Sequence, residues 1–108
     1  MKDLQDYPKG SLTVMAYFKA VSVYKKDVER ITKILVEKVK KTEKGNLIYE
    51  ASWSVNEPDC IVFHEVFENS QAFETHKETA HFKQWGIETE GMCQPGGNIF
   101  VIENDKLF

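Results

Sequence analysis

The chain has 108 residues, a hydrophobic fraction of 42% and a formal net charge of −3. Such values are typical of one globular domain with a single core. Basic and acidic residues are mixed along the chain instead of forming a basic stripe, which argues against nucleic acid as a partner. No apolar run approaches the roughly 20 residues of a membrane-spanning helix, and the polar start of the chain does not resemble a signal peptide. We therefore expect a cytoplasmic protein that binds no membrane.

The first half of the chain predicts an arm, a strand and a helix. Residues 1–10 are expected to form a loose N-terminal arm, followed by a single domain over residues 11–108. The segment 11–23 is apolar on both faces in its middle, which is typical of a buried strand. Asp27 is the expected N-cap of a helix, and Gly45 is the expected left-handed residue that ends it. The apolar positions of that helix recur at helical spacing: Val28, Ile31, Leu35 and Val39.

The second half predicts three more strands and a second helical segment. The expected elements, in chain order, are a strand over 46–55, a turn over 56–59, a strand over 60–67, a helix capped by Asn69 or Ser70, a helical turn over 80–85 capped by Thr79, and a strand over 99–102. The order β-α-β-β-α-β is typical of a ferredoxin-like α+β domain, in which helices cover one face of a four-stranded antiparallel sheet.

The uncovered face of this sheet is the reason for expecting a dimer. The first, third and fourth strands carry apolar residues on both faces, whereas the helices can cover only one face. The other face would exceed the few hundred Å² of contiguous apolar surface that soluble monomers tolerate. Two copies packed sheet to sheet as a two-fold homodimer would cover it. The alternative is a monomer whose arm and C-terminal tail cover the sheet.

Two motifs resemble the antibiotic biosynthesis monooxygenase family. The stretch Glu65–Phe82 has a strand ending in Glu-x-aromatic, a helix with a late histidine, and a Thr-x-His-aromatic turn. The stretch Lys44–Tyr49 is similar to the family's Gly-x-Leu-x-Tyr at the start of its second strand. The resemblance implies a dimeric α/β barrel. It leaves the activity open, because members include cofactor-free quinol and anthrone oxygenases, an isomerase of signal-molecule breakdown, haem-degrading enzymes and domains without a known reaction.

No cofactor is expected. The haem-degrading relatives use an asparagine on the first strand, a late tryptophan in the helix after the third strand, and a haem-ligating histidine beyond it. Here the segment 11–23 has no asparagine, His76 stands at the tryptophan position, and the position of the ligating histidine falls near Gly86. Cys60 and Cys93 form no C-x-x-C pair, and the sequence has no phosphate loop or dinucleotide-binding motif.

His76 and His81 are the candidate catalytic residues. His76 follows Ala72 and Phe73 by four and three residues, so it shares their sheet-facing side of the helix. Such a histidine is either structural or part of a pocket. The resemblance implies a pocket, where an imidazole with a pKa of about 6.5 exchanges protons at neutral pH. In a continuous helix His81 would point about 140° away from His76, so the two meet only if the helix breaks at Thr79. They lack the i,i+4 spacing of a chelating pair, so no metal is expected.

The expected substrate-binding residues are Tyr49, Trp53, Glu65 and Phe67. Glu65 lies among apolar neighbours on its strand, where a carboxylate is costly unless it is paired. It either forms an ion pair with a lysine or histidine or faces a pocket. Tyr49 and Trp53 share one face of the second strand, either as core residues or as walls for a flat substrate.

The resemblance and these residues together predict a cofactor-independent monooxygenase, an oxidoreductase that acts on a small quinol- or polyphenol-like aromatic substrate. An isomerase of the signal-molecule-processing type is one alternative. A non-catalytic ligand-binding or stress-related dimer is the other.

Overall fold

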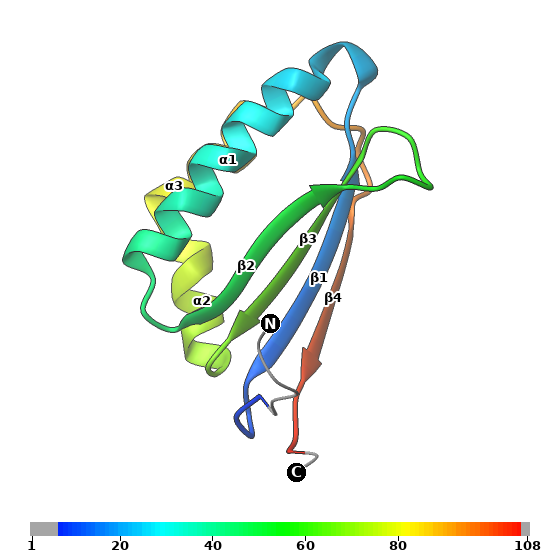
Figure 1. The fold of residues 1–108 in the computed structure, drawn as a ribbon. Coiled ribbons are helices and arrows are strands. Elements are labelled where there is room, and N and C mark those ends of the chain that lie inside the picture. The colour runs from blue at the N-terminus through cyan, green and yellow to red at the C-terminus, as the bar shows by residue number, and fades with distance from the viewer. Residues whose placement is uncertain (1–6, 107–108) are drawn as a thin grey trace.

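The computed structural model describes residues 7–106 and confirms the ferredoxin-like α+β fold (Figure 1). Its elements are β1 (Leu12–Lys19), the 3-10 turn η1 (Ser22–Tyr24), α1 (Lys25–Thr42), β2 (Asn46–Trp53), β3 (Cys60–Phe67), α2 (Ser70–Glu78), α3 (Ala80–Thr89) and β4 (Asn98–Glu103). The strands pair in the order β2-β3-β1-β4, and every pairing is antiparallel. The helices lie on one face of the sheet, as Figure 1 shows. No helix in the described part of the chain is long and apolar enough to cross a membrane.

The junction between the first strand and the first helix differs from the expectation. β1 ends at Lys19 instead of Val23, because the chain turns through η1 before it enters α1. α1 begins at Lys25, so Asp27 is not the N-cap and lies within the first turn, where a negative charge favours the helix dipole. The expected apolar stripe of this helix is confirmed, since all four of its residues are buried.

Gly45 is required by close packing and not by a left-handed backbone. α1 ends at Thr42, and Glu43 follows it with an extended backbone (φ −96°, ψ 97°). The φ of Gly45 is not positive, so the expected left-handed helix end is wrong. A Cβ atom on Gly45 would lie 2.7 Å from the Cβ of Ala72, which is closer than packing permits. The segment after α1 and the start of α2 therefore touch, and this contact keeps Glu43 close to α2.

The second half agrees more closely with the sequence. β3 spans the expected residues 60–67, and Asn69 caps α2 by accepting a hydrogen bond from the Ala72 N–H at 2.8 Å. β2 ends at Trp53 and is shorter than expected, whereas α3 extends to Thr89 and is longer. These shifts move boundaries and leave the order of the elements unchanged.

The core lies between the helices and three of the four strands. Helix-facing side chains of β1, β2 and β3 pack against the apolar stripe of α1. All six residues of β4 are exposed, because the helices do not extend over this edge of the sheet (Figure 1). Residues 1–6 of the expected N-terminal arm lie outside the described residues. Near its end, the Gly10 N–H donates to the Asn104 carbonyl at 3.0 Å.

Candidate active site

A cavity of about 100 Å³ lies between the sheet and the helices. Its apolar walls are formed by Val14, Ala16, Phe18, Leu35, Phe63, Phe73, Phe82, Trp85 and Ile99. Its polar lining residues are Glu65, Tyr49 and Lys77. The Lys77 ammonium pairs with Glu74 at 2.9 Å along α2, so Glu65 and Tyr49 remain as the polar groups of the cavity. An apolar cavity with a few polar groups is the usual form of a small-molecule site.

Glu65 is the acidic group that faces this cavity. It lies in the middle of β3 on the helix-facing side, between Val14 of β1 and Tyr49 of β2 in the sheet register. Burial, followed by repulsion from the charge of Glu43, raises the pKa of Glu65 to about 8. The carboxyl group is therefore mostly protonated at neutral pH. Burial of Tyr49, followed by the negative charges that Glu65 and Glu43 carry at high pH, raises the pKa of Tyr49, so its phenol is neutral.

His76 lies behind Glu65 and is almost completely buried, with 1% of its surface exposed. Its Nδ1 lies 2.9 Å from both carboxylate oxygens of Glu43, to which it donates, and its Nε2 lies 3.9 Å from Oε1 of Glu65. Burial lowers the pKa of His76, and the hydrogen bond to Glu43 opposes this shift in part. The ring packs against Tyr49 and Phe82, with centroids 5.3 and 4.9 Å away. The imidazole is thus held in one orientation, with one nitrogen toward each carboxyl group.

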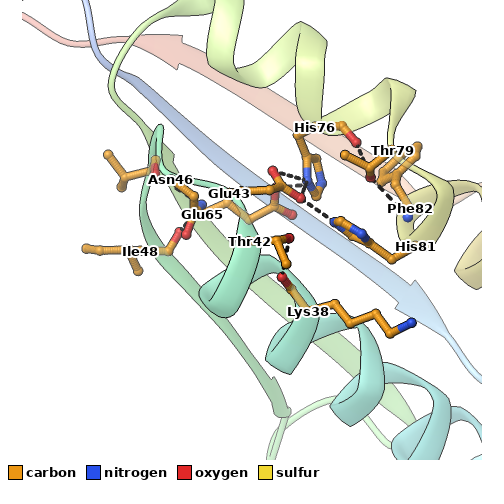
Figure 2. A network of polar contacts seen from close by, with 11 residues as sticks. Lys38, Thr42, Glu43, Asn46, Ile48, Glu65, His76, Thr79, His81 and Phe82 are labelled. Atoms are coloured by element: carbon orange, nitrogen blue, oxygen red, sulfur yellow. Dashed lines mark hydrogen bonds and ion pairs between the residues drawn. The ribbon is translucent and has the colours of Figure 1, made fainter.

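A break between α2 and α3 brings His81 to the same carboxylate. Thr79 separates the two helices with an extended backbone (φ −69°, ψ 151°). Its hydroxyl donates to the His76 carbonyl at 2.7 Å and accepts from the Phe82 N–H at 3.2 Å, so it caps both helix ends. His81 Nε2 then lies 2.5 Å from Oε2 of Glu43, a contact that is drawn as a dashed line in Figure 2. The helix break that the sequence allowed is present, and it makes the two imidazoles converge.

Glu43 is the site residue that the sequence analysis missed. It follows the last residue of α1, its side chain is 9% exposed, and it joins His76 and His81 (Figure 2). The available signal was weak: Glu43 is the one acidic residue in the lysine-rich stretch 38–44, directly before the Gly-x-Leu-x-Tyr motif. A carboxylate that accepts from one imidazole nitrogen fixes the tautomer and leaves the other nitrogen free to accept a proton.

Three of the expected site residues, Phe67, Trp53 and His81, do not line the cavity. Phe67 is fully buried, and its ring centroid lies 5.1 Å from that of His76, so it supports the imidazole and has no surface left for a substrate. Trp53 lies outside the cavity, in an open groove of about 460 Å³ between α1 and β2. Its Nε1 donates to Oε1 of Glu29 at 2.8 Å. His81 does not line the cavity either and contacts the site through Glu43.

Glu43, His76 and Glu65 follow one another in a row that ends at the cavity, with a hydrogen bond between the first two and a gap of 3.9 Å between Nε2 of His76 and Glu65; the row is called the proton relay below. Glu65 is the end that a substrate can touch, Nε2 of His76 is a proton acceptor behind it, and Glu43 stabilises the charge that such a transfer creates. Proton transfer to and from a hydroxyl or an acidic carbon is the chemistry that this arrangement can perform.

Solved structures of similar fold come from several organisms. A protein of Caulobacter crescentus CB15 that bears the antibiotic biosynthesis monooxygenase name superposes with a TM-score of 0.87 at 24% identity, over 93% of this chain and 94% of that chain. A protein of Nitrosomonas europaea with the same family name has a TM-score of 0.83 at 17% identity, over 95% of both chains. Rv0793 of Mycobacterium tuberculosis has a TM-score of 0.81 at 14% identity, over 91% of this chain and 99% of that chain. At such identities the likeness concerns the fold.

The sequence itself identifies the family. No curated protein matches the chain. The model of the antibiotic biosynthesis monooxygenase family matches residues 11–86, which include the helix break and all residues of the proton relay. Because this match spans well over half of the chain, the protein belongs to the antibiotic biosynthesis monooxygenase family.

Proposed function

We propose that this protein is a cofactor-independent monooxygenase that oxidises a small quinol-like aromatic substrate. The observation that carries the proposal is the Glu65 carboxyl group in an apolar cavity, backed by the His76–Glu43 pair. Family membership supports monooxygenase chemistry at the level of the family. The substrate class and the absence of a cofactor are our proposal.

In the proposed reaction, the proton relay removes a proton from a substrate hydroxyl. Glu65 passes its own proton to Nε2 of His76, and the resulting carboxylate accepts the proton of the substrate. The imidazolium then lies between the Glu43 carboxylate, whose negative charge stabilises it, and the Glu65 carboxyl group, which now carries the proton of the substrate. The distance of 3.9 Å between Nε2 and Glu65 is long for a hydrogen bond, but catalytic contacts often shorten when the substrate binds.

The substrate anion supplies the electrons for the reaction with oxygen. A quinol anion reduces O2 by one electron, and the two radicals combine to a peroxide anion on a ring carbon. This anion takes up a proton from Glu65 and becomes a hydroperoxide. Loss of water from this hydroperoxide leaves a hydroxyquinone, so one oxygen atom enters the product and the other leaves as water. Glu65, protonated by the substrate in the first step, thus returns that proton to the oxygen that later departs.

The size of the cavity favours substrates with a single ring. A dry protein cavity of about 150 Å³ binds benzene. A cavity of about 100 Å³ therefore accommodates one aromatic ring only if its walls move outward slightly. Ile99, on the cavity wall, belongs to the exposed strand β4 and is 60% exposed, so this side is the one free to adjust. Fused three-ring substrates such as anthrones require a larger opening.

We also propose that the functional unit is a homodimer in which a second copy covers β4. Four consecutive large apolar residues of this strand, 99–102, are each between 49% and 60% exposed. On the sheet face away from the helices, Tyr17 stacks on Phe100 with a centroid distance of 6.4 Å. Because Ile99 also lines the cavity, a partner on β4 would close the cavity on that side.

The test is oxygen consumption by the purified protein with a panel of monocyclic quinols and anthrones. Wild-type protein should consume one O2 for each quinol oxidised. Glu65→Gln, which keeps the shape and removes the titrating group, should lower turnover by about 10²–10⁴-fold. Glu50→Gln is the matched control, because this glutamate lies on β2 with 66% of its side chain exposed.

Three outcomes separate the alternatives. Quinol turnover that survives Glu65→Gln unchanged would remove the proton relay from the mechanism. Exchange of substrate hydrogen for solvent deuterium without oxygen uptake would indicate an isomerase. Saturable binding of an aromatic ligand with neither reaction would indicate a binding protein.

A further inference from the structure

We propose that Glu43, His76 and His81 form a binding site for a divalent first-row transition-metal ion, with Zn²⁺ as its expected occupant. One ligand atom from each of these residues lies within 4.8 Å of the other two. Two imidazoles and one carboxylate are a donor set that binds zinc in proteins, with a further position left for water. The site goes beyond the proposed function, which uses no metal.

The three side chains are close to the spacing of a zinc site. With ligand distances of about 2.0–2.2 Å, a tetrahedral zinc ion separates its ligand atoms by roughly 3.3 Å. Glu43 now lies 2.9 Å from His76 Nδ1 and 2.5 Å from His81 Nε2. Glu43 therefore needs to move less than about 1 Å away from each imidazole, and the two imidazole nitrogens lie within 4.8 Å of each other. The side chain of His81 is 14% exposed and connects the site to the surface.

The unpartnered nitrogen of His76 fits a metal ion that binds the other ring nitrogen. Among the residues that the structure describes, Nε2 of His76 is the one buried side-chain nitrogen or oxygen without a hydrogen-bond partner. As long as Nδ1 carries the proton and donates to Glu43, Nε2 has no proton to donate toward Glu65. A metal ion on Nδ1 displaces that proton, so the proton resides on Nε2. Nε2 then donates to the Glu65 carboxyl group, which lies 3.9 Å away.

The resulting arrangement is the usual second shell of a metal-bound histidine. A ligating imidazole generally donates its other N–H to a carboxylate, which holds the ring in place. Here Glu65 stands on the far side of His76 from Glu43, as this arrangement requires. The ligands come from the end of α1, from α2 and from the start of α3, so the ion would connect three helices (Figure 2).

Metal binding and the proposed oxygenation would exclude each other at His76. With the ion on Nδ1 and a proton on Nε2, the imidazole can no longer accept the proton of Glu65. Zn²⁺ should therefore inhibit the proposed reaction. This consequence rests on the proposed function, whereas the metal site itself does not.

The experiment is a spectroscopic titration of EDTA-treated protein with Co²⁺, which reports nitrogen and oxygen ligation through its visible ligand-field bands. Wild-type protein should develop these bands up to one ion for each chain, and Zn²⁺ should abolish them by competition. Zn²⁺ should also raise the melting temperature, because an ion that binds only the folded state stabilises it.

The variants assign the ligands. His81→Gln keeps an N–H that can donate to Glu43 but replaces a good zinc ligand, so the bands should be lost while circular dichroism shows a folded protein. Glu65→Leu removes the second-shell acceptor and should weaken binding by about 10–100-fold. His64→Ala is the matched control, because this third histidine lies in β3 and its side chain is 36% exposed.

Three results would overturn the site. The first is a wild-type protein that binds neither Co²⁺ nor Zn²⁺ saturably. The second is an unchanged titration in His81→Gln. The third is loss of the bands in His64→Ala, which would assign the ion to the protein surface. A quinol panel without any turnover would leave these readouts intact, so the metal site and the proposed function can fail separately.

Discussion

Nδ1 of His76 lies 2.9 Å from both carboxylate oxygens of Glu43. The two residues are 33 positions apart in the sequence and come from different helix ends. This contact determines which nitrogen of the imidazole carries the proton, and so it decides that Nε2 is the atom presented to Glu65. The acid–base properties of the cavity therefore depend on a residue that does not line it.

Glu43→Gln should lower turnover of the proposed substrate by about 10²–10⁴-fold with little loss of stability. The amide keeps the volume of the carboxylate, but it can present an N–H to His76 and favour the wrong tautomer. The matched control is Glu37→Gln, at a solvent-facing position of α1. Oxygen uptake per folded molecule measures the effect. Equal turnover in both variants would show that the tautomer of His76 does not matter.

His76→Ala should destabilise the fold by about 3 kcal/mol. The His76 side chain is only 1% exposed, so its removal leaves a cavity in the core. It also leaves the buried Glu43 carboxylate without one of its two histidine donors. This loss exceeds the roughly 1 kcal/mol of a typical substitution. His64→Ala, at a half-exposed position, should change stability by no more than about 0.5 kcal/mol. Urea denaturation measures both, and similar losses in the two variants would contradict the packing described for His76.

Glu65 should make the stability of EDTA-treated protein depend on pH. Its pKa is about 8 in the fold and ordinarily 4.5. Between these pH values the folded state holds one proton more than the unfolded state, so the free energy of unfolding falls as the pH rises through this range and levels off above it. Glu65→Gln lacks this titration, so the wild type should lose stability relative to the variant between pH 4.5 and about 8. Parallel stability curves from urea denaturation would show that Glu65 titrates normally.

The chain should be a dimer in solution, with light scattering giving twice the chain mass of 12.5 kDa. A specific interface of this kind buries at least about 1,200 Å² in total. Phe100→Lys should produce monomers, because it places a charge on the uncovered face of β4. Ile34→Lys is the control, since this exposed apolar residue lies on α1. A folded wild-type monomer at micromolar concentration would disprove the dimer.

Two glycine substitutions should have opposite effects on stability. Gly45→Ala places a Cβ atom 2.7 Å from that of Ala72, so it should cost about 1–3 kcal/mol. Gly86 lies inside α3 with no atom within 4 Å of its Cβ position, so Gly86→Ala should stabilise the protein by roughly 1 kcal/mol. Thermal or urea denaturation measures both. An unchanged stability in Gly45→Ala would mean that the segment that follows α1 can move away from α2 at no cost.

The sequence by itself determined the order of the elements and the residues of the core. Helical spacing in α1 reports which side chains face the core, and the strand period places Glu65 on one face with Ile61 and Phe63, because these periods follow directly from backbone geometry. Asn69 and Thr79 could be identified as caps for a similar reason, since a cap acts on N–H groups two or three residues away. The misjudged ends of β1 and α1 depend on η1, a turn without a strong residue signature.

The composition of the site was decided by the tertiary structure. Glu43 meets His76 and His81 because a helix end, a close contact at Gly45 and a break at Thr79 coincide in space, and no local pattern encodes that coincidence. Trp53 has the same strand face as Tyr49, yet it lies outside the cavity because its position along β2 places it beside Glu29 of α1. A strand period specifies the face on which a side chain lies, whereas the packing of helices over that face determines which side chains share a cavity.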